Sequence, residues 1–405
     1  MIHDTSRPTT GSHIPGETST GSKRCEALFG PDCPDDVPTR LVRSSGARIW
    51  DERGREFIDY VMGLGAVALG YGHPEVNRAA SEAIAAGVVG PLPPLLEEEV
   101  AALLSQSLPW MEQVRFLKTG AEATLAAVRL ARVHTGRDRV VTCGYHGWLD
   151  WCRSELGVPA TVRALHEHIP FNDIDRSVAC LRRLGPDLAA VVIEPVIDGE
   201  PDVEWLNRMR SETERLGAVL IFDEIKTAFR IALGGAAERY GVNPDLTVIG
   251  KALGNGFPLA AVGGRRDIMA GATKSWISST LATEQVSLAA AKAVVGIMAT
   301  ERVPRRLAEL GGRLYAGLRK LAERHPSVIS AVRGMPEMCY LEFSDPPSGF
   351  GVVREAAAHG ILWKRTAYNF VCVAHDPELI DRTLVVLEEA IRTVRDDTPK
   401  KGGSC

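Results

Sequence analysis

The feature that most constrains the fold is an alternation, between residues 96 and 265, of apolar β-rich runs with amphipathic helical stretches. Strands of a parallel sheet are buried on both faces, so they read as continuous apolar runs separated by helices. This pattern predicts an α/β fold with a mainly parallel central sheet covered by helices on both faces. The expected strands are VRFL, RVVTC, AAVVIEP, AVLIFDE, LTVIG and AAVGG, and the clearest helices are residues 121–134 and 202–216.

The predicted sheet belongs to the larger of two domains. A chain of 405 residues is too long for one small core. We expect a large domain over residues 96–299 and a smaller α+β domain built from residues 25–95 and 300–405. Residues 1–24 are rich in Ser, Thr, Gly and Pro, which predicts a disordered arm.

Two local signals indicate structure within the smaller domain. Apolar and polar residues alternate around the turn 51–54, which is typical of a hairpin. Near the other end of the chain, DPELIDRTLVVLEEAIRTVRDD predicts a closing helix with Asp376 as its N-terminal cap.

Composition and charge exclude several classes of function. Hydrophobic residues make up 45% of the chain, charged residues 24%, and the net charge is −4, so there is no basic field for nucleic acid. No apolar run has membrane-spanning length, and the polar start lacks a secretory signal, which predicts a cytoplasmic protein with a small-molecule partner. The eight cysteines form no C-x-x-C pair, so we expect free thiols, no metal site and no disulfide framework.

Two candidate features follow strands of the sheet, where ligands of open α/β folds collect. Thr119, Gly120 and Ala121 form a small-residue turn into a helix, and backbone N–H groups at a helix start can hold a phosphate. Tyr145 and His146 follow the next strand, and either ring could stack on a planar ligand. Each feature has an ordinary interpretation as well, namely a simple connecting turn and surface packing.

Two further features are charged residues at the ends of apolar strands. Asp223 would be costly there without a cationic or hydrogen-bonded partner, and a protonated pyridine nitrogen is such a partner. The alternatives for Asp223 are a helix cap or a buried ion pair. Lys251 is enclosed by apolar neighbours, which can hold its amine deprotonated, as a nucleophile that forms a Schiff base requires.

Taken in order, the motifs resemble those of class III aminotransferases of pyridoxal 5′-phosphate (PLP) fold type I. They are TGAEAT, CGYHGW, VVIEP, FDEIKTAFR, GKALGNGFPLAAVGG and STLATEQVSLAAA. Within that family the pattern is similar to the glutamate-1-semialdehyde aminomutase group, and the resemblance runs from Ala47 to Cys372. It implies a large domain with a mainly parallel sheet, a smaller α+β domain made from both ends of the chain, and PLP as cofactor.

The resemblance also implies roles for residues that contact the cofactor. Lys251 would bind PLP as a Schiff base, and Asp223 would pair with the pyridine nitrogen. Ile225 would pack on one face of the ring and Tyr145 on the other.

Other positions match the phosphate and substrate sides of the family's site. Gly120 and Ala121 match the phosphate-binding turn. Thr280 matches a threonine that reaches the phosphate from the neighbouring subunit, which implies a homodimer. Glu194 and His146 would lie near the substrate side of the cofactor.

Several positions depart from the family's pattern. Ala121 stands where Ser or Thr is usual, so a hydroxyl contact to phosphate is lost, for which Thr119 could compensate. Ala228 replaces a glycine after FDEI, and Ala282 and Thr283 replace a glycine pair, which should reshape the pocket.

The substrate is expected to differ from that of the aminomutases. Those enzymes carry an arginine in an N-terminal segment that binds the substrate carboxylate, whereas CPDDVPTRLVRSSG offers only Arg40 and Arg43, neither of which matches it. Sequences with CGYHGW resemble amino-group enzymes of polysaccharide and natural-product pathways. We therefore expect an aminotransferase that acts on an amino-acid donor and an aldehyde or ketone acceptor, such as an oxidised sugar or cyclitol.

Other functions remain open from the sequence alone. An intramolecular aminomutase of the glutamate-1-semialdehyde type, or a PLP-dependent epimerase, would use Lys251 and Asp223 in the same roles. A non-catalytic relative that binds PLP is the alternative from a different class.

Overall fold

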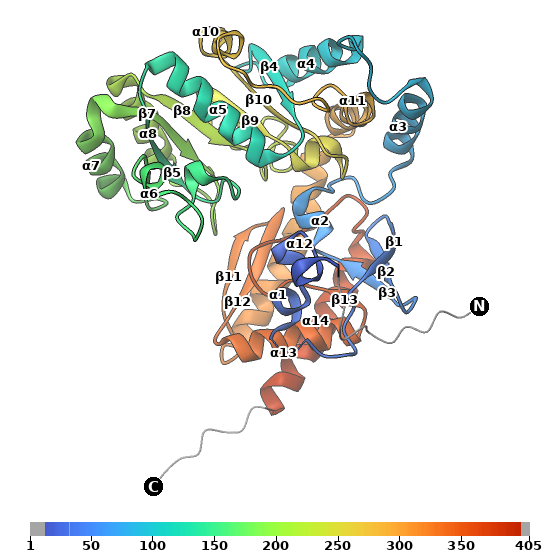
Figure 1. Ribbon diagram of the computed structural model, residues 1–405. Coiled ribbons are helices and arrows are strands. Elements are labelled where there is room, and N and C mark those ends of the chain that lie inside the picture. The colour runs from blue at the N-terminus through green and yellow to red at the C-terminus, as the bar shows by residue number, and fades with distance from the viewer. Residues whose placement is uncertain (1–12, 32, 398–405) are drawn as a thin grey trace. The chain divides into compact units, whose positions relative to one another are not determined.

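The computed structural model describes residues 13–31 and 33–397. The chain divides into two compact units (Figure 1). The larger unit comprises residues 66–68 and 74–306, and the smaller unit contains the remaining described residues.

A seven-stranded sheet in the order β4-β10-β9-β8-β7-β5-β6 forms the centre of the larger unit. Strand β10 is antiparallel to both its neighbours and the other recorded pairings are parallel, so the mainly parallel sheet is confirmed. Six strands were predicted; the seventh, β6, is short and polar, and the sequence did not indicate it. The strands are β4 (Gln113–Leu117), β5 (Arg139–Cys143), β6 (His166–His168), β7 (Leu188–Ile193), β8 (Val219–Asp223), β9 (Leu246–Ile249) and β10 (Ala260–Gly264).

Helices cover both faces of this sheet. Helix α5 (Gly120–Thr135) lies on one face, and α7 (Ile174–Leu184) and α8 (Val203–Leu216) lie on the other (Figure 1). Successive strand residues point to opposite faces, so Val192 packs in the cluster that contains α5 and Val191 in the cluster that contains α7 and α8. The sheet is therefore buried on both sides, as its apolar strands require.

Among the remaining helices of the larger unit, α11 packs against both α3 and α4. Because α3 packs on α11, residues 74–95 belong to the larger unit, which corrects the predicted boundary at residue 95. The second boundary falls after residue 306 rather than residue 299. The helices are α3 (Pro74–Ala86), α4 (Leu95–Ser107), α6 (Ala160–Arg163), α9 (Gly235–Tyr240), α10 (Arg266–Met269) and α11 (Gln285–Thr300).

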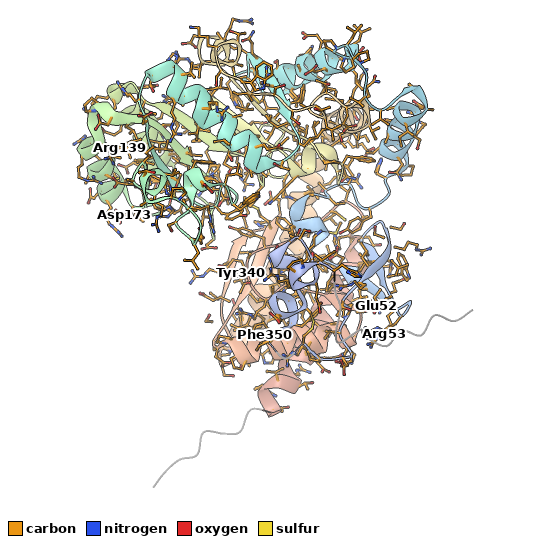
Figure 2. All side chains as sticks on the ribbon, viewed as in Figure 1. Glu52, Arg53, Arg139, Asp173, Tyr340 and Phe350 are labelled. Carbon is orange, nitrogen blue, oxygen red and sulfur yellow. A yellow bond between two sulfur atoms is a disulfide. The ribbon has the colours of Figure 1, made fainter. Side chains whose placement is uncertain are left out.

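The smaller unit is α+β, with a four-stranded sheet β1-β2-β3-β13 and a three-stranded sheet β11-β12-β14. The predicted hairpin is present between β2 and β3, with Glu52 and Arg53 in its turn (Figure 2). Asp376 caps the closing helix, because Leu379 N donates to its Oδ1 at 2.8 Å. The strands are β1 (Leu41–Ser45), β2 (Arg48–Asp51), β3 (Glu56–Asp59), β11 (Ile329–Met335), β12 (Met338–Phe343), β13 (Ile361–Leu362) and β14 (Asn369–Phe370); the helices are α1 (Cys25–Phe29), α2 (Met62–Gly65), α12 (Val303–Arg324), α13 (Pro346–Ala358) and α14 (Pro377–Asp397).

Two expectations about the N-terminal segment need correction. Of the predicted arm, residues 1–12 lie outside the described residues, but residues 13–24 contain the short helices η1 (Pro15–Glu17) and η2 (Gly21–Lys23). Cys25 and Cys33, expected as free thiols, form a disulfide. Their spacing gave no signal, but the turn after α1 brings their Cα atoms to 5.7 Å, within the range that a disulfide spans.

None of the helices in the described part of the chain is long and apolar enough to cross a membrane.

Candidate active site

Four neighbouring strands of the large sheet, β5, β7, β8 and β9, end at the same edge and carry most of the predicted site residues. The register aligns Cys143 with Ile193 and Ile193 with Phe222, so the segments after these residues start side by side. These segments supply Tyr145 and His146, Glu194, and Asp223 with Ile225, while Lys251 follows β9. The carboxyl edge of a parallel sheet thus gathers residues that are far apart in the sequence.

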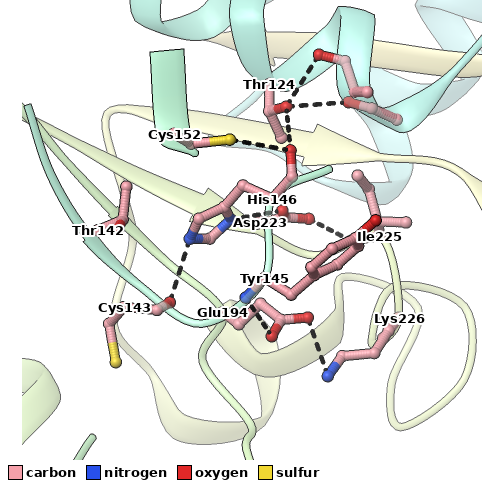
Figure 3. A network of polar contacts seen from close by, with 12 residues as sticks. Thr124, Thr142, Cys143, Tyr145, His146, Cys152, Glu194, Asp223, Ile225 and Lys226 are labelled. Carbon is pink, nitrogen blue, oxygen red and sulfur yellow. Dashed lines mark hydrogen bonds and ion pairs between the residues drawn. The ribbon is translucent and has the colours of Figure 1, made fainter. Parts of the chain in front are cut away.

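A buried pair, Asp223 and His146, lies at the centre of this edge. His146 Nδ1 is 2.8 Å from Asp223 Oδ2, and His146 Nε2 is 3.2 Å from Cys143 O (Figure 3). Asp223 and the carbonyl of Cys143 are both hydrogen-bond acceptors, so the imidazole ring is held between them. Asp223 Oδ1 also accepts from Ile225 N at 3.2 Å, so the carboxylate is fixed in its orientation.

A second carboxylate, that of Glu194 after β7, contacts the segments that follow β5 and β8. Its Oε2 accepts from Tyr145 N at 3.0 Å, and its Oε1 lies 2.9 Å from Lys226 Nζ (Figure 3). Gly144, next to Tyr145, has a φ of +103°, and a Cβ there would lie 2.7 Å from Glu194. Glycine is therefore required at this position, since the chain turns closely over the carboxylate.

Lys251 begins the short helix η5 (Lys251–Gly254) directly after β9 and Gly250. Its φ of +45° lies in the left-handed region, which costs about 1–2 kcal/mol for a residue with a side chain. Burial, followed by the positive charge of Lys226, lowers the pKa of Lys251 to about 8. At pH 7.4 about a fifth of the amine is therefore neutral, far more than for an ordinary lysine.

The turn into α5 has the features of a phosphate site. A Cβ on Gly120 would lie 2.5 Å from Ile225 Cδ1, so the backbone of the turn lies close to the segment after Asp223. In the part of the chain that the structure describes, no acceptor is recorded for the N–H groups of Gly120 and Ala121. Unpaired N–H groups at a helix start suit an anion such as the phosphate of PLP.

The predicted compensation by Thr119 does not agree with its contacts. Its hydroxyl accepts from Glu122 N at 3.2 Å and lies 2.9 Å from Glu122 Oε2, as part of a capping box. Its only hydrogen is therefore directed to Glu122. The hydroxyl caps the helix and offers no donor to a phosphate.

Two small contacts join the α5 turn to the segment that carries His146. The Thr124 hydroxyl is 3.2 Å from His146 O (Figure 3). A Cβ on Gly147 would lie 2.8 Å from Ala121 Cβ. The turn into α5 and the segment that carries His146 are therefore in direct contact.

Two predicted residues lie at the surface. Tyr145 is 60% exposed, and the Arg153 guanidinium carbon lies 5.5 Å from the centroid of its ring. Thr280 is exposed in the loop before α11, and no recorded contact among the described residues joins it to the other predicted site residues.

The sequence interpretation missed Lys226 and a partly buried ion pair between Lys118 and Glu284, whose Nζ and Oε1 atoms are 2.5 Å apart. The position of Lys226 just beyond a strand end was the available signal for its role. Lys118 precedes Thr119, and Glu284 caps α11 by accepting from Val286 N at 2.8 Å and Ser287 N at 3.0 Å. Their pairing is a contact between distant segments, for which local pattern gives no signal.

Clusters of His, Cys, Asp and Glu able to hold a metal ion are absent from the described residues.

Comparisons with known proteins identify the family. Residues 33–386 match the class III aminotransferases. Glutamate-1-semialdehyde 2,1-aminomutase of Pyrobaculum calidifontis is 35% identical, with 92% of this chain and 94% of the relative covered. Two solved structures are similar: the PLP form of the FumI protein of Sphingopyxis sp. MTA144 (TM-score 0.90, 26% identity, 95% and 94% of the two chains) and an omega-transaminase from Sphaerobacter thermophilus (TM-score 0.82, 27% identity, 88% and 91%).

This chain belongs to the class III aminotransferase family. The predicted fold class, PLP fold type I, is confirmed, and so is PLP as the cofactor of the family to which the chain belongs. The residues present at the sheet edge fit this cofactor, since they combine a buried carboxylate, a lysine and a helix start with unpaired N–H groups.

Proposed function

We propose that this protein is a PLP-dependent aminotransferase that moves an amino group from an amino-acid donor to an aldehyde or ketone acceptor. The observation that carries the proposal is that Asp223 ends β8 and Lys251 closely follows the neighbouring strand β9, with Asp223 fixed by His146. A lysine and an oriented carboxylate at one sheet edge are the two groups that this chemistry needs.

Lys251 and Asp223 would do the chemical work. Lys251 Nζ would hold PLP covalently through the aldehyde carbon and, once a donor amine displaces it, would move a proton from the donor's carbon to the cofactor's carbon. Asp223 would accept the N–H of the pyridine ring, and His146 would hold Asp223 in orientation. When bound, PLP takes up the electron pair released at the donor's carbon.

The remaining predicted residues would position the cofactor and substrate. Gly120 and Ala121 would donate their backbone N–H groups to the phosphate. Ile225 and Tyr145 would pack on the two ring faces, and Glu194 would lie toward the substrate.

The acceptor class rests on the CGYHGW motif, together with the residues that differ from the family's pattern. Ala228 is fully buried and its N–H donates to Glu224 O at 2.9 Å, whereas Ala282 and Thr283 are half-buried in the loop before α11. These changes support a reshaped pocket, and we propose an oxidised sugar, a cyclitol or another natural-product intermediate as acceptor.

We further propose a homodimer that works in the cytoplasm. Large apolar side chains are exposed in the loop before α4, at the first residue of α4, and in the loop before α11. The first of these loops contacts the start of α11, where Gln285 N donates to Val88 O at 2.8 Å. These side chains are Val88, Val89, Leu92, Leu95, Trp276 and Leu281. Such a patch supports an interface with a second copy, across which Thr280 would reach the partner's phosphate site. Light scattering of the wild-type protein and of Leu281→Asp tests this, since a monomeric wild type contradicts it.

The second candidate is an intramolecular aminomutase, which the 35% identity to a glutamate-1-semialdehyde 2,1-aminomutase favours. The two arginines that could receive a substrate carboxylate have other partners. Arg40 lies 3.9 Å from Glu17, and the Arg43 guanidinium carbon lies 3.8 Å from the Trp50 ring centroid. These contacts support an aminotransferase, which moves the amino group between two substrates, over an aminomutase, which moves it within one substrate.

The absorption spectrum of the purified protein with PLP, followed during titration with amino acids, tests the proposal. We expect a donor to remove the absorption band of the bound cofactor and to release a keto acid, and a carbonyl acceptor to restore the band. Lys251→Ala should bind PLP without forming the band and should release no keto acid.

The other outcomes separate the alternatives. A band that persists while the substrate's α-proton exchanges with deuterated solvent would identify a mutase or an epimerase. If neither the band changes nor any proton exchanges, the protein is a non-catalytic PLP-binding relative.

A further inference from the structure

Lys226 and Glu194 form an ion pair in a part of the site that has little contact with solvent. Their atoms Nζ and Oε1 are 2.9 Å apart, and their side chains are 13% and 8% exposed. Removing two charges from water costs free energy, which is offset only when the geometry is good and the remaining oxygens have partners. The second oxygen of Glu194 has such a partner in Tyr145 N. The pair is therefore fixed by the segments that follow β5, β7 and β8.

The segment that carries Lys226 runs next to the segment that carries Lys251, the residue that would react. Glu224 N donates to Val248 O at 2.9 Å, and a Cβ on Gly250 would lie 3.8 Å from Ile225 Cγ1. The charged groups that act on the Lys251 amine are Lys226 and Arg230, which disfavour its protonation, and Glu194 and Asp223, which favour it. Burial is the first cause of the lowered pKa of Lys251, and among these charges Lys226 has the largest influence. Glu194, which raises the pKa of Lys251, is thus paired with Lys226, which lowers it.

We propose that Lys226 is a positioning residue that acts on Lys251 through its charge, and that Glu194 holds this charge in place beside the reacting amine. The inference rests on the proposed role of Lys251. The neutral Nζ has the lone pair that would form the bond to the cofactor's aldehyde carbon, and the carbonyl oxygen would leave as water with the two protons of the amine. A protonated Nζ has no lone pair, so a nearby positive charge favours the reactive form.

A purely structural role for the pair makes a different prediction. If the pair only joins the strand ends, then removing Lys226 or removing Glu194 destabilises this edge of the sheet in the same way and shifts the titration of Lys251 in the same direction. If it acts through charge, then removing Lys226 and removing Glu194 shift the titration of Lys251 in opposite directions.

The experiment measures the titration of Lys251 in the cofactor-free protein. Lysines are labelled by reductive methylation with ¹³C-formaldehyde, and the signal of Lys251 is assigned as the one absent from Lys251→Ala. Lys226→Met should raise its midpoint by about one pH unit, and Glu194→Gln should lower it. Lys226→Arg, which keeps the charge, should leave the midpoint near that of the wild type.

A matched control is Lys292→Met, because Lys292 forms an exposed ion pair with Glu99 at 2.7 Å in the same unit of the chain. It should leave the midpoint unchanged. The proposal is wrong if Lys226→Met leaves the midpoint unchanged, or if Lys226→Met and Glu194→Gln shift it in the same direction. If Lys226→Met does not fold, then Lys226→Gln takes its place with the same expected shift.

Failure of this inference is distinguishable from failure of the proposed function. If Lys251→Ala still gives the absorption band of the bound cofactor, the assignment of Lys251 itself is wrong. If that band is lost but the titration does not respond to Lys226, only the inference about Lys226 fails.

Discussion

His146 Nδ1 lies 2.8 Å from Asp223 Oδ2, and the two residues are only 4% and 3% exposed. A hydrogen bond to a buried carboxylate is among the stronger interactions that a side chain makes. His146, which follows β5, thus holds the carboxylate of Asp223, which ends β8 and would face the cofactor.

Replacing His146 by Phe should weaken this hold. The substitution leaves Asp223 Oδ2 without its donor, which for a charged group costs about 1.5–3 kcal/mol. We expect the dissociation constant of PLP to rise at least tenfold, measured by fluorescence titration of the cofactor-free protein. His168→Phe is the control, because His168 is an exposed histidine of β6. Equal effects of the two substitutions would contradict the role of His146.

The capture of PLP by the cofactor-free protein should depend on the protonation of Lys251. Its pKa is lowered to about 8, mainly by burial, so the amine is mostly protonated below this pH and mostly neutral above it. The rate of covalent capture, followed by absorbance, should rise about tenfold per pH unit below the midpoint and level off above it. A rate that keeps rising to pH 10 would mean that the lysine titrates normally. Lys251→Ala should show no covalent capture at any pH.

Glu224 should make stability depend on pH. Burial raises its pKa to about 7 from 4.5, although Ala236 N and Ala237 N donate to its carboxylate at 2.9 and 2.8 Å. Because the folded state binds this proton more tightly than the unfolded state, the stabilisation is fully present below pH 4.5 and is lost as the pH rises through 7.

Glu224→Gln should remove this dependence. Between pH 5 and pH 8 the stability of the wild type relative to the variant should fall by roughly 2–3 kcal/mol, seen as a falling difference in melting temperature. Glu214→Gln, at an exposed position of α8, is the control. A constant difference between the wild type and Glu224→Gln would show that Glu224 is ionised throughout.

Gly120→Ala should disturb the turn at the start of α5. The added Cβ would lie 2.5 Å from Ile225 Cδ1, so Ile225 must move, at a cost of about 1–3 kcal/mol. We expect PLP affinity to fall at least tenfold in the same fluorescence titration. Gly296→Ala in α11 has no atom within 4 Å of the new Cβ and should leave affinity unchanged. Unchanged affinity in Gly120→Ala would separate this turn from the cofactor.

The disulfide between Cys25 and Cys33 can be tested by thiol counting. The unfolded protein should offer two more reactive thiols after reduction than before it. Cys33→Ser should cost about 2 kcal/mol of stability under oxidising conditions, because the bridge restricts the unfolded chain. Cys180→Ser, at a half-buried free cysteine, is the control. Cysteines that are already reduced in protein taken from cells would support the proposed cytoplasmic location.

Much of the larger unit could be predicted from the sequence because its signals are local. Apolar runs bounded by turns predicted six of the strands that form the seven-stranded sheet, and helical spacing predicted α5 and α8. The same reasoning placed Lys251 and Asp223 at strand ends, since a charged residue directly after a buried run must lie at the edge of the sheet. The short polar strand β6 was missed, because it lacks the apolar pattern on which this reasoning depends.

The sequence by itself therefore determined the type and order of the elements, and which charged residues end the strands. Only the tertiary structure decided which of these residues meet: His146 with Asp223, Lys226 with Glu194, and Cys25 with Cys33. The physical reason is that periodicity records how each segment is buried, whereas pairing depends on the order of strands in the sheet. Crossover helices bring together ends that are distant in the chain, and no local pattern encodes that order.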